Sequence, residues 1–310
     1  MLHYFAPMEG LTVSVYRRLH HKYFPGVDRY YMPFLSPTVH RCLTHKEDRE
    51  LPPADKEAFV AVPQILTKVP EDFLWAARQC ADRGYEEINL NLGCPSGTVV
   101  AKGKGAGMLA DPESLDRFLD SIFQASPLPI SVKTRLGMTE PEEFPRLLDV
   151  FNQYPIRELI VHPRVRKQFY DGKVDLEMFR YAAGHSRLPL CYNGDLTSPA
   201  DTARIENQYP MLNAMMLGRG LLADPGMLCP GGTTADTLEA FTGELLETYL
   251  SLFGGSRNAM FRMKEHWSFL RTRFADSDGL WKRLRKTTDL AEYRSLTAEC
   301  FRTLSLTSSR

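Results

Sequence analysis

A repeated alternation of short apolar runs and longer helix-like segments is the feature of this 310-residue sequence that most limits its fold. Eight runs rich in β-branched, aromatic and aliphatic residues predict strands at 3–6, 29–32, 59–63, 88–92, 130–133, 159–162, 188–192 and 215–217. Helix-compatible stretches lie between them, for example 70–83, 112–125, 142–153 and 199–207. This alternation predicts parallel β/α units closed into an α/β fold of the (β/α)8 TIM-barrel type.

The end of the chain has a different pattern. The alternation stops near Asp224, and from Thr234 onward Leu, Phe and Trp recur at the three- and four-residue spacings of packed helices. Pro230-Gly231-Gly232 is the expected linker. We therefore predict a TIM-barrel domain over residues 1–230 and an all-helical domain over residues 234–310.

Charge is distributed unevenly between these two parts, although 38 Lys and Arg balance 38 Asp and Glu overall. Residues 251–310 hold twelve Lys or Arg and six Asp or Glu, which leaves 26 and 32 in the other 250 residues. Basic and aromatic residues are interleaved from Arg257 to Lys286, which fits either a solvated helix face or a phosphate-contacting surface. On the second interpretation, we expect Lys264 and Arg271 to bind nucleic acid.

Several classes of protein are not expected from this sequence. No run approaches about 18 consecutive apolar residues, so we expect no transmembrane helix. Residues 1–7 lack the basic and apolar regions of a signal peptide. The six cysteines are scattered without a CxxC pair, so no metal site is expected and the cytoplasm is the expected compartment.

Polar or glycine-rich residues follow nearly every predicted strand. In a β/α barrel the reactive groups lie at the carboxyl ends of the strands, so these residues predict a site at the barrel mouth. The candidates are Pro7, Met8, Glu9, Gln64, Asn91, Cys94, Lys133, Arg135, His162, Asn193, Gly194, Asp195, Gly218 and Arg219.

The loops after the last two strands suit a phosphate group. Asn193-Gly194-Asp195 and Gly218-Arg219-Gly220 stand where barrels commonly bind phosphate through backbone N–H groups, and Arg219 adds a charge. Ordinary tight turns are the alternative interpretation.

Three side chains from the middle strands are further candidates for the site, and two of them suit a flavin. Lys133 ends an otherwise uncharged strand, and its ammonium suits the electron-rich edge of a flavin ring. Gln64 fits either a hydrogen bond to the same ring or a satisfied core amide, and His162 fits either a site residue or a structural one.

Cys94 is the most informative of the candidate residues. It lies between Gly93 and Pro95, on a turn expected to present its thiol. An ordinary thiol is mostly protonated at pH 7 and can act as a general acid, whereas the other five cysteines are better interpreted as small buried hydrophobes. The glycine-rich stretch 102–107 lacks the P-loop arrangement and fits a mobile basic lid or an RNA-facing loop that begins at Lys102.

Together these residues resemble the tRNA-dihydrouridine synthase family. The resemblance covers the barrel almost end to end; Asn89, Gly97 and Pro163 depart from the family pattern without removing a catalytic group. The matching motifs are Ala6-Pro7-Met8-Glu9-Gly10, Asn91-x-Gly93-Cys94-Pro95, Lys102-Gly103-x-Gly105, Ser131-Val132-Lys133-x-Arg135-Leu136-Gly137, His162-x-Arg164-x-Arg166-x-Gln168-x-Tyr170, Asn193-Gly194-Asp195, Gly218-Arg219-Gly220 and Arg262-x-Lys264.

The resemblance implies an FMN-dependent oxidoreductase of tRNA processing that reduces the C5=C6 bond of specific uridines to 5,6-dihydrouridine. NAD(P)H, with NADPH expected, would reduce the flavin. Cys94 would be the proton donor and Asn91 would face the target uracil, with Lys102 and Arg135 as further substrate contacts. FMN would be held by Pro7, Met8, Glu9, Gln64, Lys133, His162, Asn193, Gly194, Asp195, Gly218 and Arg219.

The helical domain would bind tRNA, and we expect a monomeric protein. Two alternatives stay open: an FMN-dependent barrel oxidoreductase of a small molecule of the dihydroorotate or enoate type, and a non-catalytic RNA-binding protein. The cysteine after the fourth strand and the basic tail argue against the first of them, because a small substrate needs neither.

Overall fold

A computed structural model describes residues 1–307 of the chain, which divides into two compact units. The first unit comprises residues 1–7, 28–194 and 206–216, and the second comprises residues 8–27, 195–205 and 217–310. Because the two units interleave along the chain, the predicted domain boundary at residues 230–234 stays a prediction.

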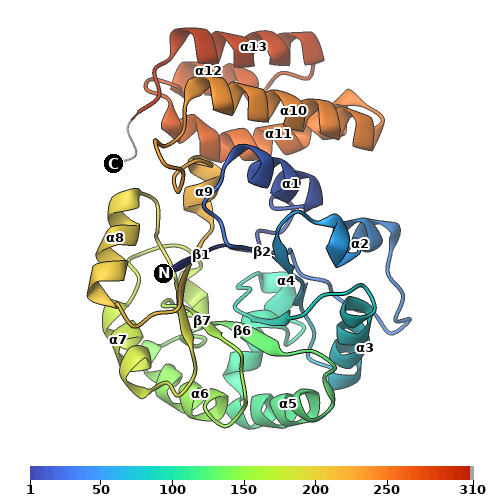
Figure 1. The fold of residues 1–310 in the computed structure, drawn as a ribbon, viewed down its shortest axis with the longest axis vertical. Helices are drawn as coiled ribbons and strands as arrows, with labels where there is room; N and C mark the ends of the chain where they lie inside the picture. Colours follow the sequence, from blue (N-terminus) through green and yellow to red (C-terminus); the bar gives the residue numbers. More distant parts are fainter. Residues whose placement is uncertain (308–310) are drawn as a thin grey trace. The chain divides into compact units, whose positions relative to one another are not determined.

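The first unit is built on one parallel sheet that closes into a barrel (Figure 1). Neighbouring strands follow the order β3-β2-β1-β9-β8-β7-β6-β5-β4. Only Pro63, which has no N–H for the sheet, separates β3 from β4, so these two form one interrupted strand and the ring has eight members. The (β/α)8 prediction is confirmed. The strands are β1 (Leu2–Phe5), β2 (Arg29–Tyr31), β3 (Val60–Val62), β4 (Gln64–Ile65), β5 (Ile88–Leu92), β6 (Ile130–Arg135), β7 (Leu159–His162), β8 (Leu190–Asn193) and β9 (Ala214–Leu217).

Helices α3, α5, α6 and α7 lie around the outside of this sheet in Figure 1. Helix α5 shows why they form where they do: the Asp111 carboxylate caps the Ser114 N–H at 3.1 Å, and Pro112 occupies the first turn. Its Leu115, Phe118 and Ile122 are buried on one face. The helices before the second unit's own are α2 (His45–Glu50), α3 (Pro70–Ala81), α4 (Gly97–Val100), α5 (Pro112–Ala125), α6 (Phe144–Phe151), α7 (Leu176–His185) and α8 (Pro199–Gln208), the last divided between the units.

Buried charges occupy the amino ends of the strands. Glu87 precedes β5 and pairs with Arg29 at 2.6 Å and with Arg157 at 2.8 Å. Glu158 precedes β7 and accepts hydrogen bonds from the Tyr4 hydroxyl and the Asn213 amide, at 3.3 and 2.5 Å, and burial raises its pKa. These carboxylates are only 5 and 3 % exposed and already engaged, so this end of the barrel has a structural role.

The second unit is helical. Helix α10 begins at the Thr234 cap and ends where Gly254 adopts a left-handed φ of +62°. It packs against α1 through edge-to-face rings: the Phe241 ring centroid lies 5.5 Å from that of Tyr16 and 5.2 Å from that of Phe24. The helices are α1 (Ser14–Tyr23), α9 (Arg219–Ala223), α10 (Ala235–Phe253), α11 (Ser256–Leu270), α12 (Asp278–Leu284) and α13 (Leu290–Thr303).

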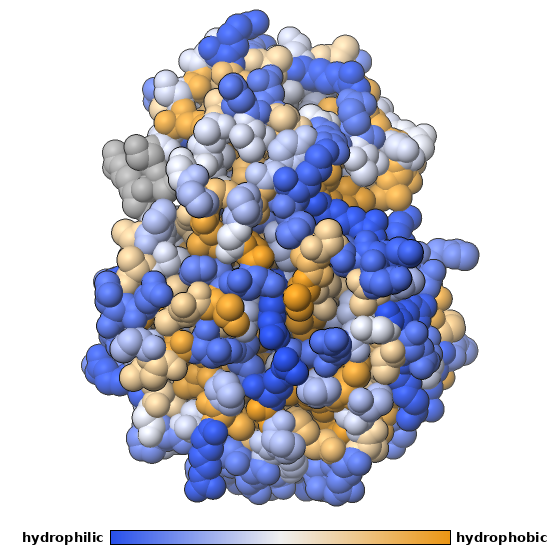
Figure 2. All heavy atoms as spheres, viewed as in Figure 1, coloured by the Kyte–Doolittle hydropathy of each residue, from blue (hydrophilic) through white to orange (hydrophobic). Residues whose placement is uncertain are grey.

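The surface mixes hydrophilic and hydrophobic residues on the face drawn in Figure 2. Across residues 1–307, no helix combines the length and the apolar character that crossing a membrane requires.

Candidate active site

Strand register gathers polar side chains inside the carboxyl half of the barrel. In parallel pairs, Gln64 of β4 lies beside Asn89 of β5, and Asn89 beside Ser131 of β6. Two residues further along, Asn91 pairs with Lys133. Because side chains alternate across a strand, residues 131, 133 and 135 share one face, as do 89 and 91. The barrel mouth is therefore lined by amides and cations above an apolar interior.

The amides form one continuous hydrogen-bonded chain. The Asn91 amide donates to Gln64 Oε1 at 2.7 Å, and the Gln64 amide donates to Asn89 Oδ1 at 2.8 Å. The Asn89 amide then donates to Ser131 Oγ at 2.9 Å. Since Gln64 and Asn89 are fully buried, this chain fixes the direction of each amide.

Asn91 also holds the turn that carries Cys94. Its Oδ1 accepts the N–H groups of Gly93 at 3.1 Å and Cys94 at 2.9 Å. On the other side, Gly105 adopts a φ of +57°, and a Cβ there would lie 3.0 Å from Cys94 Cβ. The half-buried Cys94 is thus enclosed by tightly packed backbone, and its position is fixed by Asn91.

Replacement of Asn91 tests this arrangement. We expect Asn91→Ala to lower the free energy of unfolding by about 2–4 kcal/mol, because two N–H groups and the Gln64 carbonyl lose their partner. Urea denaturation measures the change, with the exposed Asn207→Ala as a matched control that should change it by less than about 0.5 kcal/mol. Equal effects of the two substitutions would contradict the role of Asn91.

Lys133 brings a positive charge to this polar layer. Burial, and to a lesser extent the nearby Arg135 guanidinium, lowers its pKa from 10.5 to about 8. Among residues 1–307 no carboxylate pairs with its ammonium. Lys133 is therefore a desolvated cation in the barrel mouth that an electron-rich ligand would stabilise.

Arg135 and Arg164 are buried and tie the loops of the mouth together. Arg135 donates to the Gly93 carbonyl at 2.9 Å and to the Val165 carbonyl at 3.1 Å, which joins the loops after β5 and β7. Arg164 lies 3.0 Å from His162 Nε2 and also donates to the Gly172 carbonyl at 2.5 Å. A guanidinium has only donors, so His162 Nε2 accepts and its Nδ1 carries the proton.

The loop after β8 approaches His162 closely. Gly194 has a φ of +157°, and a Cβ there would lie 2.9 Å from Val174 and 3.4 Å from the His162 ring. Beside it, the Asn193 amide donates to the Met216 carbonyl at 2.7 Å. A side chain at residue 194 would collide with these neighbours, so glycine is what allows the buried backbone to pass this close to His162. Pro7, two residues after the end of β1, is half-buried.

The remaining predicted cofactor residues belong to the second unit. Arg219 pairs with Asp195 at 2.9 Å, so the structure brings these two together. The Met8 carbonyl accepts the N–H groups of Leu11 and Thr12 at 3.0 Å in a tight turn, on which Glu9 is exposed. Gly218 immediately precedes α9.

The basic residues of the helical region fall into an engaged group and an exposed group. Lys264 donates to the Thr287 carbonyl, and burial lowers its pKa. Arg271 pairs with Asp278 at 2.8 Å and lies 5.6 Å from the Trp281 ring centroid. Among residues 1–307, the exposed cations of this region that form no ion pair are Arg257, Lys282, Arg285, Lys286 and Arg302.

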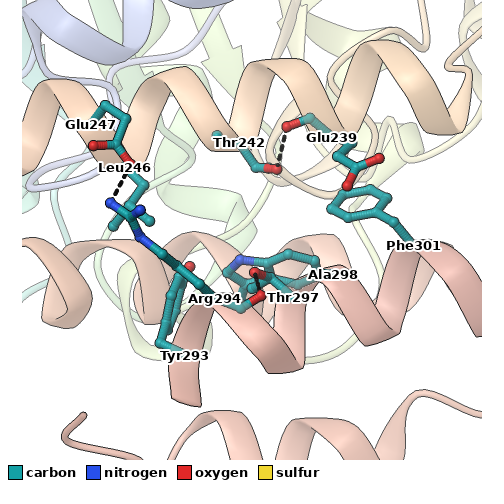
Figure 3. A pocket seen from close by; sticks show the side chains of 11 residues that line it. Glu239, Thr242, Leu246, Glu247, Tyr293, Arg294, Thr297, Ala298 and Phe301 are labelled. Carbon is teal, nitrogen blue, oxygen red and sulfur yellow. Dashed lines mark hydrogen bonds and ion pairs between the residues drawn. The ribbon is translucent and has the colours of Figure 1, made fainter. Parts of the chain in front are cut away.

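A pocket of about 190 Å³ opens between α10 and α13 of the second unit (Figure 3). Trp267 and Tyr293 line it and are almost fully buried. The side chains of Glu239 and Glu247 also line it, and Glu247 pairs with Arg294 at 2.7 Å. This acidic lining disfavours phosphate, so a polyanion is expected on another face of the unit.

The sequence did not reveal the contacts that the supporting residues of the mouth make. Asn89 and Ser131 complete the amide chain, and Arg164 fixes the His162 ring. The alternation of strand residues identifies the face of the first two, whereas Arg164 lies in a loop and was marked only by the motif His162-x-Arg164-x-Arg166. Lys102 is exposed, beside a Gly103 whose added Cβ would lie 3.3 Å from Lys68 Nζ.

Comparison with known proteins gives a family. The profile of the dihydrouridine synthase (Dus) family matches residues 4–299. The tRNA-dihydrouridine synthase B of Pasteurella multocida is 28% identical over 224 residues, which are 72% of this chain and 66% of that protein. A probable tRNA-dihydrouridine synthase of Staphylococcus epidermidis is 30% identical over 237 residues, covering 71% of this chain and 68% of that protein. The aligned part is about two thirds of the length of these curated relatives.

A solved structure supports the fold independently. Morphinone reductase superposes with a TM-score of 0.53 at 11% identity, covering 73% of this chain and 83% of that chain. At this identity the likeness concerns the barrel fold alone.

Proposed function

The chain belongs to the dihydrouridine synthase family, and from this membership we propose that it reduces the C5=C6 bond of uridines in tRNA to 5,6-dihydrouridine. The observation that carries the proposal is the arrangement of Cys94. Its turn is held by Asn91, and Asn91 of β5 lies beside Lys133 of β6 in the sheet. A thiol fixed at a barrel mouth beside a desolvated cation suits a proton donor to a base that accepts hydride.

The barrel mouth fits the FMN that the family implies. Lys133 offers an ammonium with no carboxylate partner among residues 1–307, and Gly194 brings the backbone against the His162 ring with no side chain between them. We propose that Pro7, Gln64, Lys133, His162, Asn193 and Gly194 hold the cofactor. Met8, Glu9, Asp195, Gly218 and Arg219 keep, as a proposal, the cofactor-binding role implied by the family resemblance.

The side chains of the mouth have separate tasks in this reaction. When bound, the flavin supplies the hydride that reaches C6 of the uracil. Cys94 supplies the proton that C5 takes up, so the thiol ends as a thiolate and needs a proton from solvent. Asn91 positions Cys94 and also faces the substrate in our proposal, and Arg135 holds both sides of the Cys94 turn. The Lys133 ammonium stabilises negative charge on the bound flavin. Because burial lowers the pKa of Lys133, a nearby negative charge favours its protonated form.

The decisive experiment incubates the purified protein and FMN with unmodified tRNA and NADPH, our proposed reductant, and maps dihydrouridine in the product. We expect dihydrouridine at defined positions and no NADPH oxidation with free uracil or enoates. Turnover confined to small molecules would support a small-molecule oxidoreductase instead. A protein that binds tRNA but forms no dihydrouridine would support the non-catalytic alternative.

We propose that tRNA phosphates contact the helical region through Lys282, Arg285 and Lys286, with Lys264, Arg271 and Lys102 as further contacts. Lys282 lies on the last turn of α12, Arg285 is its C-cap residue and Lys286 follows directly, and all three side chains are exposed. Lys264 and Arg271 are already engaged inside the unit. Because Lys282, Arg285 and Lys286 form no such bonds, they displace counterions from tRNA more effectively than Lys264 and Arg271 do.

Salt dependence of tRNA binding tests this order. We expect the triple variant Lys282→Ala/Arg285→Ala/Lys286→Ala to lower the slope of log affinity against log salt by about 2–3. The double variant Lys264→Ala/Arg271→Ala should change it by less than about 1, and the exposed Arg180→Ala on α7 should leave it unchanged. A larger change in the double variant than in the triple would contradict the proposal.

The proposal places the reaction in the cytoplasm, where tRNA is modified, and takes the active form to be a monomer. No group of three or more His, Cys, Asp or Glu that could hold a metal occurs within residues 1–307, and none of the proposed steps requires one.

A further inference from the structure

The loop after β7 presents an exposed aromatic ring with a cation on it. The Phe169 side chain is 41% exposed, and the Arg166 guanidinium lies 5.1 Å from its ring centroid. Lys173 of the same loop is exposed, and Lys167, also exposed, pairs with Glu140 at 2.6 Å. A solvated aromatic ring flanked by cations is the combination with which proteins stack on unpaired nucleic-acid bases.

The backbone at Phe169 is strained. Its φ of +50° and ψ of −97° lie in a region that residues with a side chain rarely adopt. Hydrogen bonds on both sides maintain this conformation: the Phe169 N–H donates to the Arg166 carbonyl at 3.1 Å, and the Val165 N–H donates to Gln168 Oε1 at 2.8 Å. The loop thus holds the ring in one place at an energetic cost, which is typical of functional positions.

The same loop is bonded to the Cys94 turn at two points. Arg166 Nε donates to the Pro95 carbonyl at 3.2 Å. Arg135 connects the Gly93 carbonyl, at 2.9 Å, with the Val165 carbonyl, at 3.1 Å. The residues on either side of Cys94 are therefore linked to the segment that carries Phe169.

We propose that Phe169 is a stacking platform for an unpaired base next to the target uridine in tRNA. The inference rests on the proposed function, because it assumes that one uridine reaches Cys94. A base that leaves its stack exposes the faces of its neighbours, and an aromatic ring fixed beside the reacting position covers one of them. The Arg166 guanidinium lies over the same ring, and there it pairs with the backbone phosphate of the stacked nucleotide. Phe169 thereby selects tRNA sites whose flanking nucleotide is unpaired.

Steady-state kinetics on tRNA test the platform. We expect Phe169→Ala to raise KM for tRNA by about 5- to 150-fold, the range of base–aromatic stacking, with kcat at saturating tRNA within about 3-fold of wild type. Phe169→Trp should keep KM near the wild-type value, and Phe169→Leu should lose most of the affinity because it lacks a π-face. Met211→Ala, which removes a 70% exposed apolar side chain at the amino end of β9, is the matched control and should change neither constant.

A glycine substitution separates stacking from a structural role. Phe169→Gly relieves the positive φ, so it should raise resistance to urea while it raises KM as Phe169→Ala does. A ring that only supported the loop would make both properties worse together, and that result would overturn the inference. An unchanged KM in Phe169→Ala, or a loss of flavin with unchanged tRNA affinity, would overturn it as well. If wild-type protein forms no dihydrouridine in tRNA, the proposed function fails and this inference falls with it.

Discussion

Cys94→Ala is expected to lower the rate of dihydrouridine formation by about 10²- to 10⁴-fold, which is the usual contribution of a positioned general acid. The uracil C5 then has no proton donor on the protein, and proton uptake must come from water. Flavin content and tRNA affinity should stay near wild type, because the side chain is small and the turn is held by Asn91 through the backbone N–H of residue 94. Single-turnover reduction of tRNA by flavin-loaded, prereduced enzyme measures this rate.

Two further variants make the interpretation specific to Cys94. Cys94→Ser keeps the size of the side chain but offers a much weaker acid, so its rate should stay close to that of Cys94→Ala. The exposed Cys42→Ala removes a thiol from the same unit and should leave the rate unchanged. A Cys94→Ala enzyme that reduces tRNA at the wild-type rate would remove Cys94 from the mechanism while leaving the barrel and the flavin proposal intact.

Local sequence signals predicted the helices and strands themselves better than the points where one element is interrupted or meets the next. Both ends of α5 follow from Asp111-Pro112 and from the apolar spacing behind them, and the structure confirms 112–125. By contrast, the strand predicted at 59–63 is interrupted at Pro63 and continues as β4, because Gln64 and Ile65 pair with β5. That pairing is a tertiary interaction between distant segments, and no local pattern contains it.

The candidate site shows the same division. Placing Gln64, Lys133 and His162 at the mouth needs only the rule that reactive groups follow strands. Which amide contacts which depends on register, and so the chain from Asn91 to Ser131 is visible only in the closed barrel. The charge count identified the basic tail, yet packing decides which cations already have a partner inside the protein. Lys264, for example, donates to the Thr287 carbonyl.

Loop geometry was the least predictable feature. The strained φ at Phe169 arises from a turn closed by Gln168 and from contacts with the loop after β6, where the Arg166 N–H donates to the Gly137 carbonyl at 2.8 Å. Neither hydrophobic periodicity nor turn-forming residues mark that position in the sequence. In the sequence, Phe169 stands between basic residues inside the motif that begins at His162, and only the structure shows that its ring is exposed.

Lys133→Met should raise the free energy of unfolding of the flavin-free protein and weaken its binding of FMN. Burial and the Arg135 charge lower the Lys133 pKa from 10.5 to about 8, so the folded protein holds this proton less tightly than the unfolded chain does. Stability therefore rises with pH between about 8 and 10.5, and below pH 8 the charged lysine costs the fold about 2–3 kcal/mol, an upper value because the residue keeps some exposure. Methionine removes this cost, and urea denaturation at pH 7 and pH 10 should show a difference between the two proteins that is large at pH 7 and small at pH 10.

Flavin binding should move in the opposite direction. A charge-assisted hydrogen bond contributes about 1.5–3 kcal/mol, so Lys133→Met should weaken FMN binding by about 10- to 150-fold, measured by quenching of flavin fluorescence. Lys56→Met removes an exposed lysine of the same unit and should change neither stability nor FMN affinity. If Lys133→Met lost stability and bound FMN normally, the ammonium would be a structural group. The expected opposite changes identify a cation whose cost to the fold is offset only when an electron-rich ligand occupies the barrel mouth.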